Sequence, residues 1–290
     1  MMRWKMTTRE GEESHLVHAI KSLPTMTMSD LVFSSNIHMA KGYELRSWNG
    51  LKFKLFKDAL MHIGKLSAGE SSMMVVLMDY NLYLMRVVLA INEDPFIERK
   101  GKLNEQNKIS KVLHCDGLLL CVLREDRTRV IVWNPYWGQT RSIELSRYRH
   151  LPGAHDRLFR YALGYEDKGS YRSYKILRFI DQSYNTPINL FLGYEIYDFD
   201  SSLWKTLDIT PVWRILYRHH GVSVKGDTYW PASQIDSPIY GIDDHIICFN
   251  FTSESIGPLL RLPFDARYND DVTLSCVREE KLVVLLTHSE

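Results

Sequence analysis

The residues of this chain that come closest to a catalytic pattern surround Ser223. The stretch GVSVK (residues 221–225) has the first glycine and the serine of a nucleophile elbow, but Lys225 stands where that turn requires a second glycine. The alternative interpretation is a strand that leads into a turn at residues 225–227. The chain has no Walker loop, no dinucleotide fingerprint and no convincing pair of carboxylates. We therefore predict no catalytic residue and no enzymatic activity.

Histidine and cysteine side chains could in principle hold a metal ion near the middle of the chain. His114 and Cys115 are adjacent and Cys121 follows them, but the two cysteines lack the short spacing of a zinc knuckle. No second pair follows at zinc spacing. Buried free thiols in a β core explain these cysteines better. We expect no metal and no cofactor.

Arginine and aromatic residues gather in two stretches that could contact a partner. They are RYRHLPGAHDRLFRY (147–161) and WRILYRHH (213–220). Such mixtures can stack on nucleic-acid bases, and they also dominate protein–protein interfaces. The formal net charge is only +1, which favours a protein partner over nucleic acid or an anionic membrane. A solvated loop without a partner is the alternative for both stretches.

The tryptophans separate into two groups by their position in the sequence. Trp133 and Trp204 lie within copies of a repeated unit, where we expect core or interblade packing. Trp137, Trp213 and Trp230 lie at turns and strand ends, where we expect exposure, and an exposed tryptophan would mark a site. Together with the two arginine-rich stretches, these positions supply the candidate target-binding residues, which are Arg149, Arg157, Trp213, Arg218, His219 and Trp230.

Short β-rich segments must position these side chains from about residue 112 onward. Gly, Pro, Asn and Asp punctuate the chain there, and the segments between them have strand composition without a sustained helical period. The segments are 117–123, 129–133, 175–180, 194–199, 246–251 and 281–286. This part of the chain is predicted to be all-β.

One unit recurs three times among these strands. Each copy is an apolar strand ending in an aromatic residue, followed at once by Asn or Asp, a polar turn and a second extended stretch. The pairs are Trp133–Asn134, Tyr197–Asp198 and Phe249–Asn250. The Asn or Asp side chain can bond its own backbone and start the turn. Recurring strands of this kind are typical of propeller blades, so we expect a mainly β, irregular β-propeller-like fold. The irregular spacing leaves a β-sandwich or a kelch-type repeat as alternatives.

Seven segments, in this order, resemble the type 1 F-box-associated interaction domain of plant F-box proteins. They are ISKVLHCDGLLLC (109–121), VIVWNPYWGQTRSIE (130–144), YALGYEDK (161–168), YKILRF (174–179), YEIYDFDSSLWKTLDITP (194–211), GVSVKGDTYW (221–230) and TLSCVREEKLVVL (273–285). The resemblance covers roughly residues 72–287. It implies a substrate receptor of a cullin-based (SCF) ubiquitin ligase: an F-box binds the Skp-type adaptor, and the β domain holds an unknown target protein.

The F-box itself is only partly recognisable. TMSDL (27–31) resembles its start, but Leu31 is followed by Val32 where the family has proline. RSWNGLKFKLFKDALMHIGK (46–65) resembles its last helix and exit, and an apolar face predicts a helix over 51–63. On this resemblance the adaptor-binding candidates are Leu31, Trp48 and Leu51.

The expected organisation has three parts. Residues 1–26 are predicted to be a disordered extension, 27–65 a degenerate, helical F-box remnant, and 72–290 the F-box-associated β domain, truncated at its C-terminus relative to the family. No signal peptide or membrane span is predicted, so we expect a cytoplasmic or nuclear protein. Two alternatives stay open. One is a degenerate relative that no longer binds the adaptor. The other is a propeller-fold enzyme, which would need polar residues clustered at the mouth of the central channel.

Overall fold

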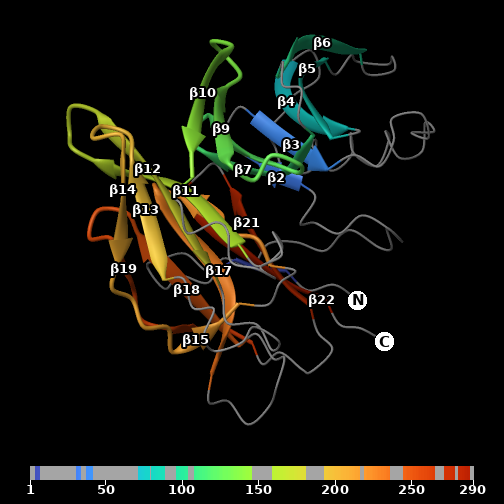
Figure 1. Ribbon diagram of the computed structural model, residues 1–290. Coiled ribbons are helices and arrows are strands. Elements are labelled where there is room, and N and C mark those ends of the chain that lie inside the picture. Colours follow the sequence, from blue (N-terminus) through green and yellow to red (C-terminus); the bar gives the residue numbers. More distant parts are fainter. Residues whose placement is uncertain are drawn as a thin grey trace. The chain divides into compact units, whose positions relative to one another are not determined.

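The structure is a computed structural model, shown in Figure 1. It describes residues 4–6, 31–33, 37–41, 71–78, 80–88, 96–103, 108–145, 159–180, 193–215, 219–235, 244–264, 271–277 and 280–287. These residues form 22 strands in five sheets. They fall into two compact units: unit 1 comprises residues 1–29, 113–116 and 144–290, and unit 2 comprises residues 30–112 and 117–143.

Unit 2 contains a five-stranded sheet and most of a four-stranded sheet. The first has the order β2-β3-β4-β5-β6, in which only the β3–β4 pair is parallel. Its strands are β2 (Leu31–Phe33), β3 (Ile37–Lys41), β4 (Ser71–Met78), β5 (Asn81–Val88) and β6 (Phe96–Lys102). The second has the order β10-β9-β8-β7, with strands β7 (Ile109–Cys115), β8 (Leu118–Leu123), β9 (Arg129–Asn134) and β10 (Gln139–Glu144).

The core of unit 2 follows from the two-residue period of its strands. Leu119, Cys121 and Leu123 alternate along β8, and all three are buried. Ile131 and Trp133 do the same on β9. They pack in one apolar cluster with Val75, Leu82, Leu84, Leu103 and Ile109. Alternation therefore directs one face of each strand into the core, as a pleated sheet requires.

Unit 1 contains three sheets. One has the order β11-β12-β13-β14, with strands β11 (Phe159–Asp167), β12 (Arg172–Ile180), β13 (Tyr194–Asp198) and β14 (Leu203–Leu207). The next has the order β15-β17-β18-β19, with β16 also on β17 and β20 on β18. Its strands are β15 (Trp213–Arg214), β16 (Val222–Val224), β17 (Asp227–Gln234), β18 (His245–Asn250), β19 (Ser255–Ile256) and β20 (Leu260–Arg261). The third has the order β1-β22-β21, formed by β1 (Trp4–Met6), β21 (Asp271–Val277) and β22 (Lys281–Thr287).

Aromatic side chains join the first two sheets of unit 1. Phe179 of β12 stacks on Tyr194 at 4.7 Å between ring centroids and meets the edge of Trp230 at 5.6 Å. Gly164 of β11 is needed for this packing, because a Cβ there would lie 2.2 Å from Phe251 Cδ2 and 2.3 Å from the Gly226 carbonyl oxygen. The sheets lie side by side in Figure 1, and β11 contacts both β16 and β17.

The repeated unit of the sequence is a hairpin at the outer edge of a sheet. The three copies are β9–β10, β13–β14 and β18–β19, and β10, β14 and β19 each stand at one end of their sheet order. Asn134 Oδ1 accepts hydrogen bonds from the backbone N–H groups of Tyr136 and Trp137, at 3.1 and 3.2 Å. Asp198 Oδ1 does the same two and three residues ahead, and Asn250 Oδ1 three residues ahead. The predicted role of these side chains in starting the turns is confirmed.

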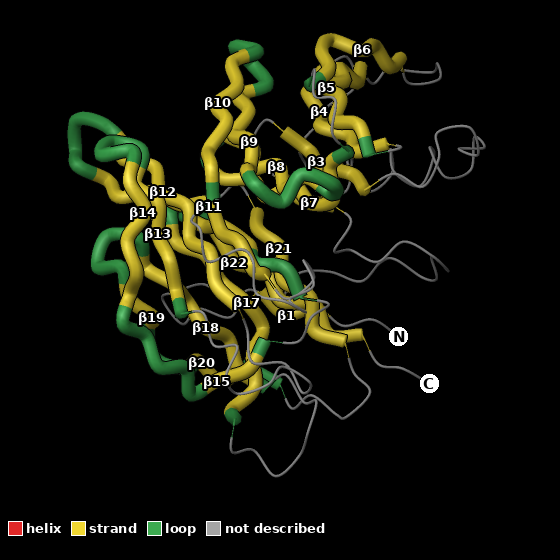
Figure 2. Tube along the Cα trace, in the orientation of Figure 1, coloured by secondary structure: helices red, strands yellow, loops and turns green. Residues whose placement is uncertain are grey.

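The six segments predicted as strands all are strands, and Figure 2 shows the described residues as strands joined by turns. The mainly β fold class is confirmed. Within the range 27–65, however, the described residues Leu31–Phe33 and Ile37–Lys41 are strands rather than helix. The helix expected at 51–63 lies outside the described residues. Trp4–Met6, in the expected extension 1–26, pairs with Val283–Leu285.

Candidate protein-interaction surface

Two hairpin tips in unit 1 present large apolar side chains to solvent at the same end of the β11–β14 sheet. Tyr171, in the β11–β12 turn, is 52% exposed, and Leu203, at the start of β14, is 67% exposed. Both hairpins have short turns, since β12 begins five residues after β11 ends and β14 begins five residues after β13 ends. Tyr171, Leu203 and the polar residues beside them are called the unit 1 tip surface below.

Asp200 fixes the arrangement of the unit 1 tip surface. Its Oδ2 accepts hydrogen bonds from Ser173 Oγ at 2.7 Å, Lys168 Nζ at 3.2 Å and the Tyr171 hydroxyl at 3.2 Å. The Ser173 and Lys168 hydrogen bonds favour the charged carboxylate and hold the pKa of Asp200 below its usual value. Lys168 Nζ also lies 5.5 Å from the centre of the Tyr171 ring. One carboxylate therefore ties the two turns together and orients Tyr171.

Arg172 extends the tip surface with a half-exposed guanidinium. Its Nη1 bonds Asp116 Oδ1, and its guanidinium lies 4.7 Å from the centre of the Tyr165 ring. The Tyr174 hydroxyl donates to the other oxygen of Asp116. Burial raises the pKa of Tyr174, and the hydrogen bond to Asp116 raises it further, so this tyrosine stays protonated and keeps donating.

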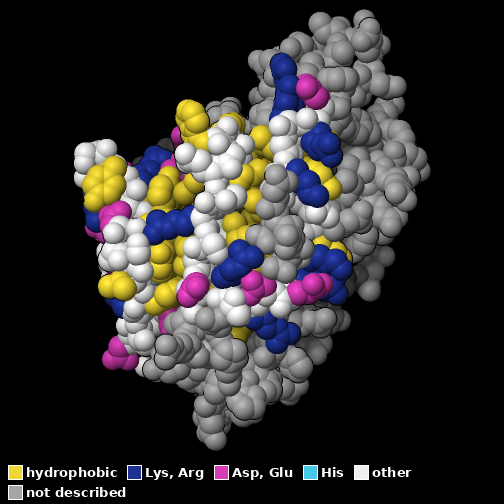
Figure 3. Space-filling model, turned by 45° about the horizontal axis from the view of Figure 1, so that its top comes forward, with side chains coloured by type: hydrophobic (Ala, Val, Ile, Leu, Met, Phe, Trp, Pro, Cys, Tyr) yellow, Lys and Arg dark blue, Asp and Glu magenta, His cyan; other side chains and the backbone are white. Residues whose placement is uncertain are grey.

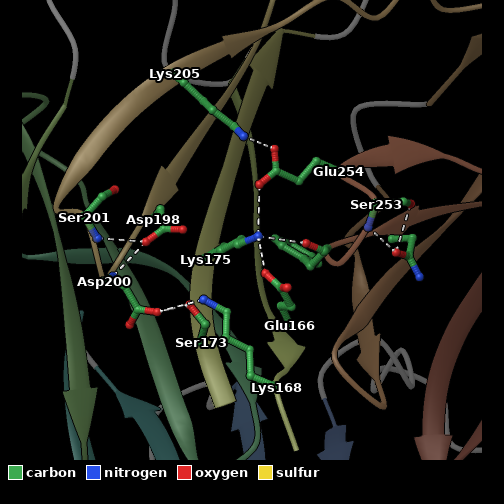
Figure 4. A network of polar contacts seen from close by, with 12 residues as sticks. Glu166, Lys168, Ser173, Lys175, Asp198, Asp200, Ser201, Lys205, Ser253 and Glu254 are labelled. Carbon is green, nitrogen blue, oxygen red and sulfur yellow. Dashed lines mark hydrogen bonds and ion pairs between the residues drawn. The ribbon is translucent and has the colours of Figure 1, made fainter. Parts of the chain in front are cut away.

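A buried lysine supports the tip surface from below. Lys175 Nζ donates to Glu166 Oε2 at 2.9 Å, Glu254 Oε1 at 2.9 Å and the Phe251 carbonyl at 3.1 Å, as Figure 4 shows. Burial disfavours the charge of Lys175, but the two carboxylates outweigh it and raise its pKa. Glu254 also bonds Lys205 of β14. The cluster links β11, β12, β14 and the turn after β18.

The carboxylates of the tip surface are engaged by neighbouring side chains. The carboxylates of Asp116 and Asp200 already accept hydrogen bonds from neighbouring side chains of the domain. Among the described residues no group of three or more His, Cys, Asp or Glu could hold a metal ion. Tyrosine and arginine beside an exposed leucine on rigid turns are the residue types that concentrate binding energy at protein interfaces. In Figure 3, hydrophobic side chains lie among charged ones on the face drawn.

The described residues among the predicted target-binding candidates are buried. Trp230 is 1% exposed and Trp213 is 6% exposed, so the expectation that these tryptophans are exposed is wrong. Trp230 faces inward from β17, against Phe179 and so close to Gly221 that a Cβ there would lie 2.6 Å from the indole. His219 is buried too, and its carbonyl accepts a 2.6 Å hydrogen bond from Arg160 Nη1.

Of the other predicted site residues, Leu31 alone lies among the described residues. Leu31 begins β2. Five further candidates lie outside the described residues, namely Trp48, Leu51, Arg149, Arg157 and Arg218.

The predictions for Trp133 and Trp137 are confirmed. Trp133 is buried in the core of unit 2, and Trp137 is exposed. Trp204 is half-buried rather than part of the core: it packs on Tyr197 at 5.3 Å and donates from Nε1 to the Glu144 carbonyl at 2.8 Å. Ser223 lies in a strand that leads into a turn, as the strand-and-turn interpretation of GVSVK predicts, and its Oγ donates to the Leu163 carbonyl at 2.9 Å. All four cysteines are free, and Cys115, Cys121 and Cys276 are buried.

Sequence reasoning missed Tyr171, Leu203 and Lys175. The predicted contact residues came from long, arginine-rich connections, whereas these three residues lie at or beside short turns. One signal was available: Tyr171 follows the turn sequence Lys168–Gly169–Ser170, and Gly169 has φ +78°, which favours glycine. A bulky aromatic directly after such a turn is at a hairpin tip, where exposure is the rule.

Comparisons with known proteins agree with the resemblance seen in the sequence. A family described as "F-box associated beta propeller domain" matches residues 73–290. A putative F-box/kelch-repeat protein of Arabidopsis thaliana is 54% identical over 226 residues, which are 74% of this chain and 53% of that protein. A putative F-box protein and an F-box protein of the same plant are 46% and 45% identical, each over 93% of this chain and over 66% and 67% of their own lengths.

The chain thus spans about half to two thirds of the length of these curated relatives. Among solved structures, that of YjhT covers 70% of this chain and 69% of its own at 9% identity, with a TM-score of 0.35. Within the described residues there is no helix long and apolar enough to cross a membrane.

Proposed function

Because the chain belongs to the family of plant F-box proteins that carry an F-box-associated β-propeller domain, we propose that it is a non-catalytic substrate receptor of an SCF-type ubiquitin ligase. Its β domain would hold a target protein while a Skp-type adaptor links it to the cullin. The family match over residues 73–290 is the observation that carries this proposal. The proposal places the protein in the cytoplasm or the nucleus.

The unit 1 tip surface supports the target-binding part of this proposal. Tyr171 and Leu203 are exposed, yet their turns are held by the Asp200 and Lys175 clusters. A rigid surface loses little conformational entropy when it binds. Exposed tyrosine, arginine and leucine are residue types that suit a protein surface.

A second candidate is a relative that holds a target but no longer binds the adaptor. Two observations favour it. Leu31 is followed by Val32 where the family has proline, and Leu31–Phe33 is a β-strand, whereas an F-box supplies helices at that place. On this alternative the chain would compete with intact receptors for the same target and would protect it from ubiquitination.

A pull-down with a purified Skp-type adaptor separates the two candidates. The full chain is tested beside a relative with an intact F-box, and circular dichroism and gel filtration first establish that both are folded. Retention of the adaptor at a level comparable to the control supports the receptor. A folded chain that fails to retain the adaptor supports the alternative and removes the ligase part of the proposal.

A double variant then tests the unit 1 tip surface. Tyr171→Ala with Leu203→Ala removes its two exposed apolar side chains, and we expect unchanged adaptor retention but weaker target binding. Unchanged affinity for an identified target would exclude this surface as the contact.

A further inference from the structure

The β9–β10 turn of unit 2 exposes two neighbouring aromatic rings. Trp137 is 78% exposed and Tyr136 is 49% exposed, which makes Trp137 the most exposed large hydrophobic residue among those described. Its indole makes no ring contact with another described residue. Trp133, four residues earlier on β9, is buried. Tryptophan is highly buried on average, so its exposure at a turn calls for an explanation by a partner.

The turn that carries Trp137 is fixed from within. Asn134 Oδ1 accepts hydrogen bonds from the backbone N–H groups of both Tyr136 and Trp137. Gly138 closes the turn with φ +66°, a conformation that favours glycine. The exposed rings are therefore presented in one backbone conformation before any partner arrives, which reduces the entropy lost on binding.

The strand that follows adds charge and polarity to this tip. Gln139, Thr140, Arg141 and Ser142 of β10 are all exposed, and Arg141 is the one charged residue between Asn134 and Ile143. Tryptophan, tyrosine and arginine are the three residue types most enriched at interface hot spots. A cation exposed on the same hairpin, four residues after Trp137, favours a partner surface that carries carboxylates.

We propose that Tyr136, Trp137 and Arg141, called the unit 2 tip, bind the target protein, with Trp137 inserted into an apolar pocket bordered by acidic side chains. The proposal rests on the proposed function only in one respect, namely that the bound target is then ubiquitinated. Single-stranded nucleic acid also stacks on aromatic rings beside arginine. The nearly balanced charge of the chain, 36 Lys and Arg against 35 Asp and Glu, favours protein.

Photo-crosslinking from within the full chain identifies what contacts the tip. The variant Trp137→p-benzoylphenylalanine is expressed in plant cells and irradiated, beside a matched variant Val212→p-benzoylphenylalanine. Val212 is a comparably exposed apolar residue in unit 1 to which we assign no role. We expect a protein adduct at position 137 that is absent at 212. Absence of a 137-specific adduct, or adducts only to nucleic acid or to a second copy of the chain, overturns the proposal.

The crosslinked protein is then purified and titrated against variants of the full chain. Trp137→Ala is expected to weaken binding about 30-fold or more, and Trp137→Phe by less, because a phenyl ring fills part of the pocket. Arg141→Glu is expected to slow association, most strongly at low salt. Val212→Ala should leave the affinity within about twofold. An affinity of Trp137→Ala within about twofold of the wild type overturns the proposal, provided that its thermal unfolding matches that of the wild type.

Adaptor retention by the wild type and by Trp137→Ala separates this inference from the proposed function. A target bound through Trp137 by a chain that fails to retain the adaptor sustains the inference and removes the receptor function. If the chain retains the adaptor but Trp137→Ala does not change its affinity for the target, the receptor function is sustained and the inference about Trp137 is overturned.

Discussion

Two buried cations on β12 are neutralised by carboxylates in different ways. Lys175 and Arg178 lie three residues apart, so the alternation of the strand directs them to opposite faces of the sheet. Lys175 Nζ donates to two carboxylates and one carbonyl, and its side chain is 4% exposed. Arg178, at 3%, bonds Glu195 at 3.2 Å and lies 4.0 Å from the centre of the Phe159 ring. Its Nε has no hydrogen-bond partner among the described residues.

The difference lies in where the counter-charges come from. Glu195 is the cross-strand neighbour of Arg178 within the β11–β14 sheet. Glu254, by contrast, belongs to the turn between β18 and β19, so Lys175 joins two sheets as well as two strands. One pair therefore stabilises pairing within a sheet, and the other cluster stabilises packing between sheets at the end where the exposed tips lie.

Removing Lys175 is expected to have the largest effect. Lys175→Met leaves the carboxylates of Glu166 and Glu254 without their shared cation, and breaking a buried ion pair from one side costs about 3–5 kcal/mol of the free energy of unfolding. Urea unfolding measures the loss.

The matched control for Lys175 is Lys205→Met, which also removes a partner of Glu254, but from a side chain that is 58% exposed. Its expected cost is below about 1 kcal/mol. Equal losses for the two lysines would show that burial does not set the strength of this cluster.

His114 extends the comparison with Lys175 and Arg178, because burial favours the neutral form of this side chain. Burial lowers its pKa from 6.5 to about 4, and the nearby Asp116 only partly opposes this. Between those values the unfolded chain binds a proton that the folded chain does not. The contribution to stability is therefore complete above about pH 6.5 and is lost as the pH falls toward 4, by about 2 kcal/mol at pH 5. Unfolding at pH 7 and pH 5 should differ less in His114→Gln than in the wild type. An unchanged difference would place the protonation elsewhere.

Replacing Arg178 is expected to lower the free energy of unfolding by less than replacing Lys175 does. Arg178→Met breaks one hydrogen bond and one ring contact but leaves the Glu195 carboxylate buried. We expect the free energy of unfolding to fall by about 2 kcal/mol. In the double variant with Glu195→Met the buried carboxylate that Arg178 compensates is removed as well, so most of this loss should return. A double-mutant cycle of unfolding free energies measures this recovery. Additive losses would mean that the two side chains act independently.

A smaller effect than for the buried charged groups is expected for Asn134, whose turn is held by uncharged hydrogen bonds. Asn134→Ala removes the acceptor of two backbone N–H groups at an exposed position and is expected to cost about 1 kcal/mol. Asn250→Ala should cost more, because Asn250 Nδ2 also donates to Asp227 Oδ2 at 3.0 Å. Thermal unfolding of both variants gives the order, and a reversed order would contradict this account.

Local physics explains why the strands and turns were predictable and the surface was not. The aromatic–Asn/Asp–turn unit is recognisable because one side chain bonds its own backbone a few residues ahead, so the cause lies within a few letters of sequence. Trp137 was placed correctly for the same reason. Trp213 and Trp230 were misplaced because their burial depends on partners far along the chain, such as Phe179 for Trp230. The Lys175 cluster spans 79 residues to Glu254, a distance that no local pattern encodes.

The Asn134 turn also bears on how such a protein changes over generations. Its backbone geometry depends on an oxygen at position 134 and a glycine at position 138, while the three residues between them have no part in strand pairing. Pro135 is buried, but Tyr136 and Trp137 are exposed, so mutations at positions 136 and 137 would alter what the tip presents at little cost in folding. Duplicated copies of the gene could thus diverge in partner choice one codon at a time while the sheet beneath stays the same.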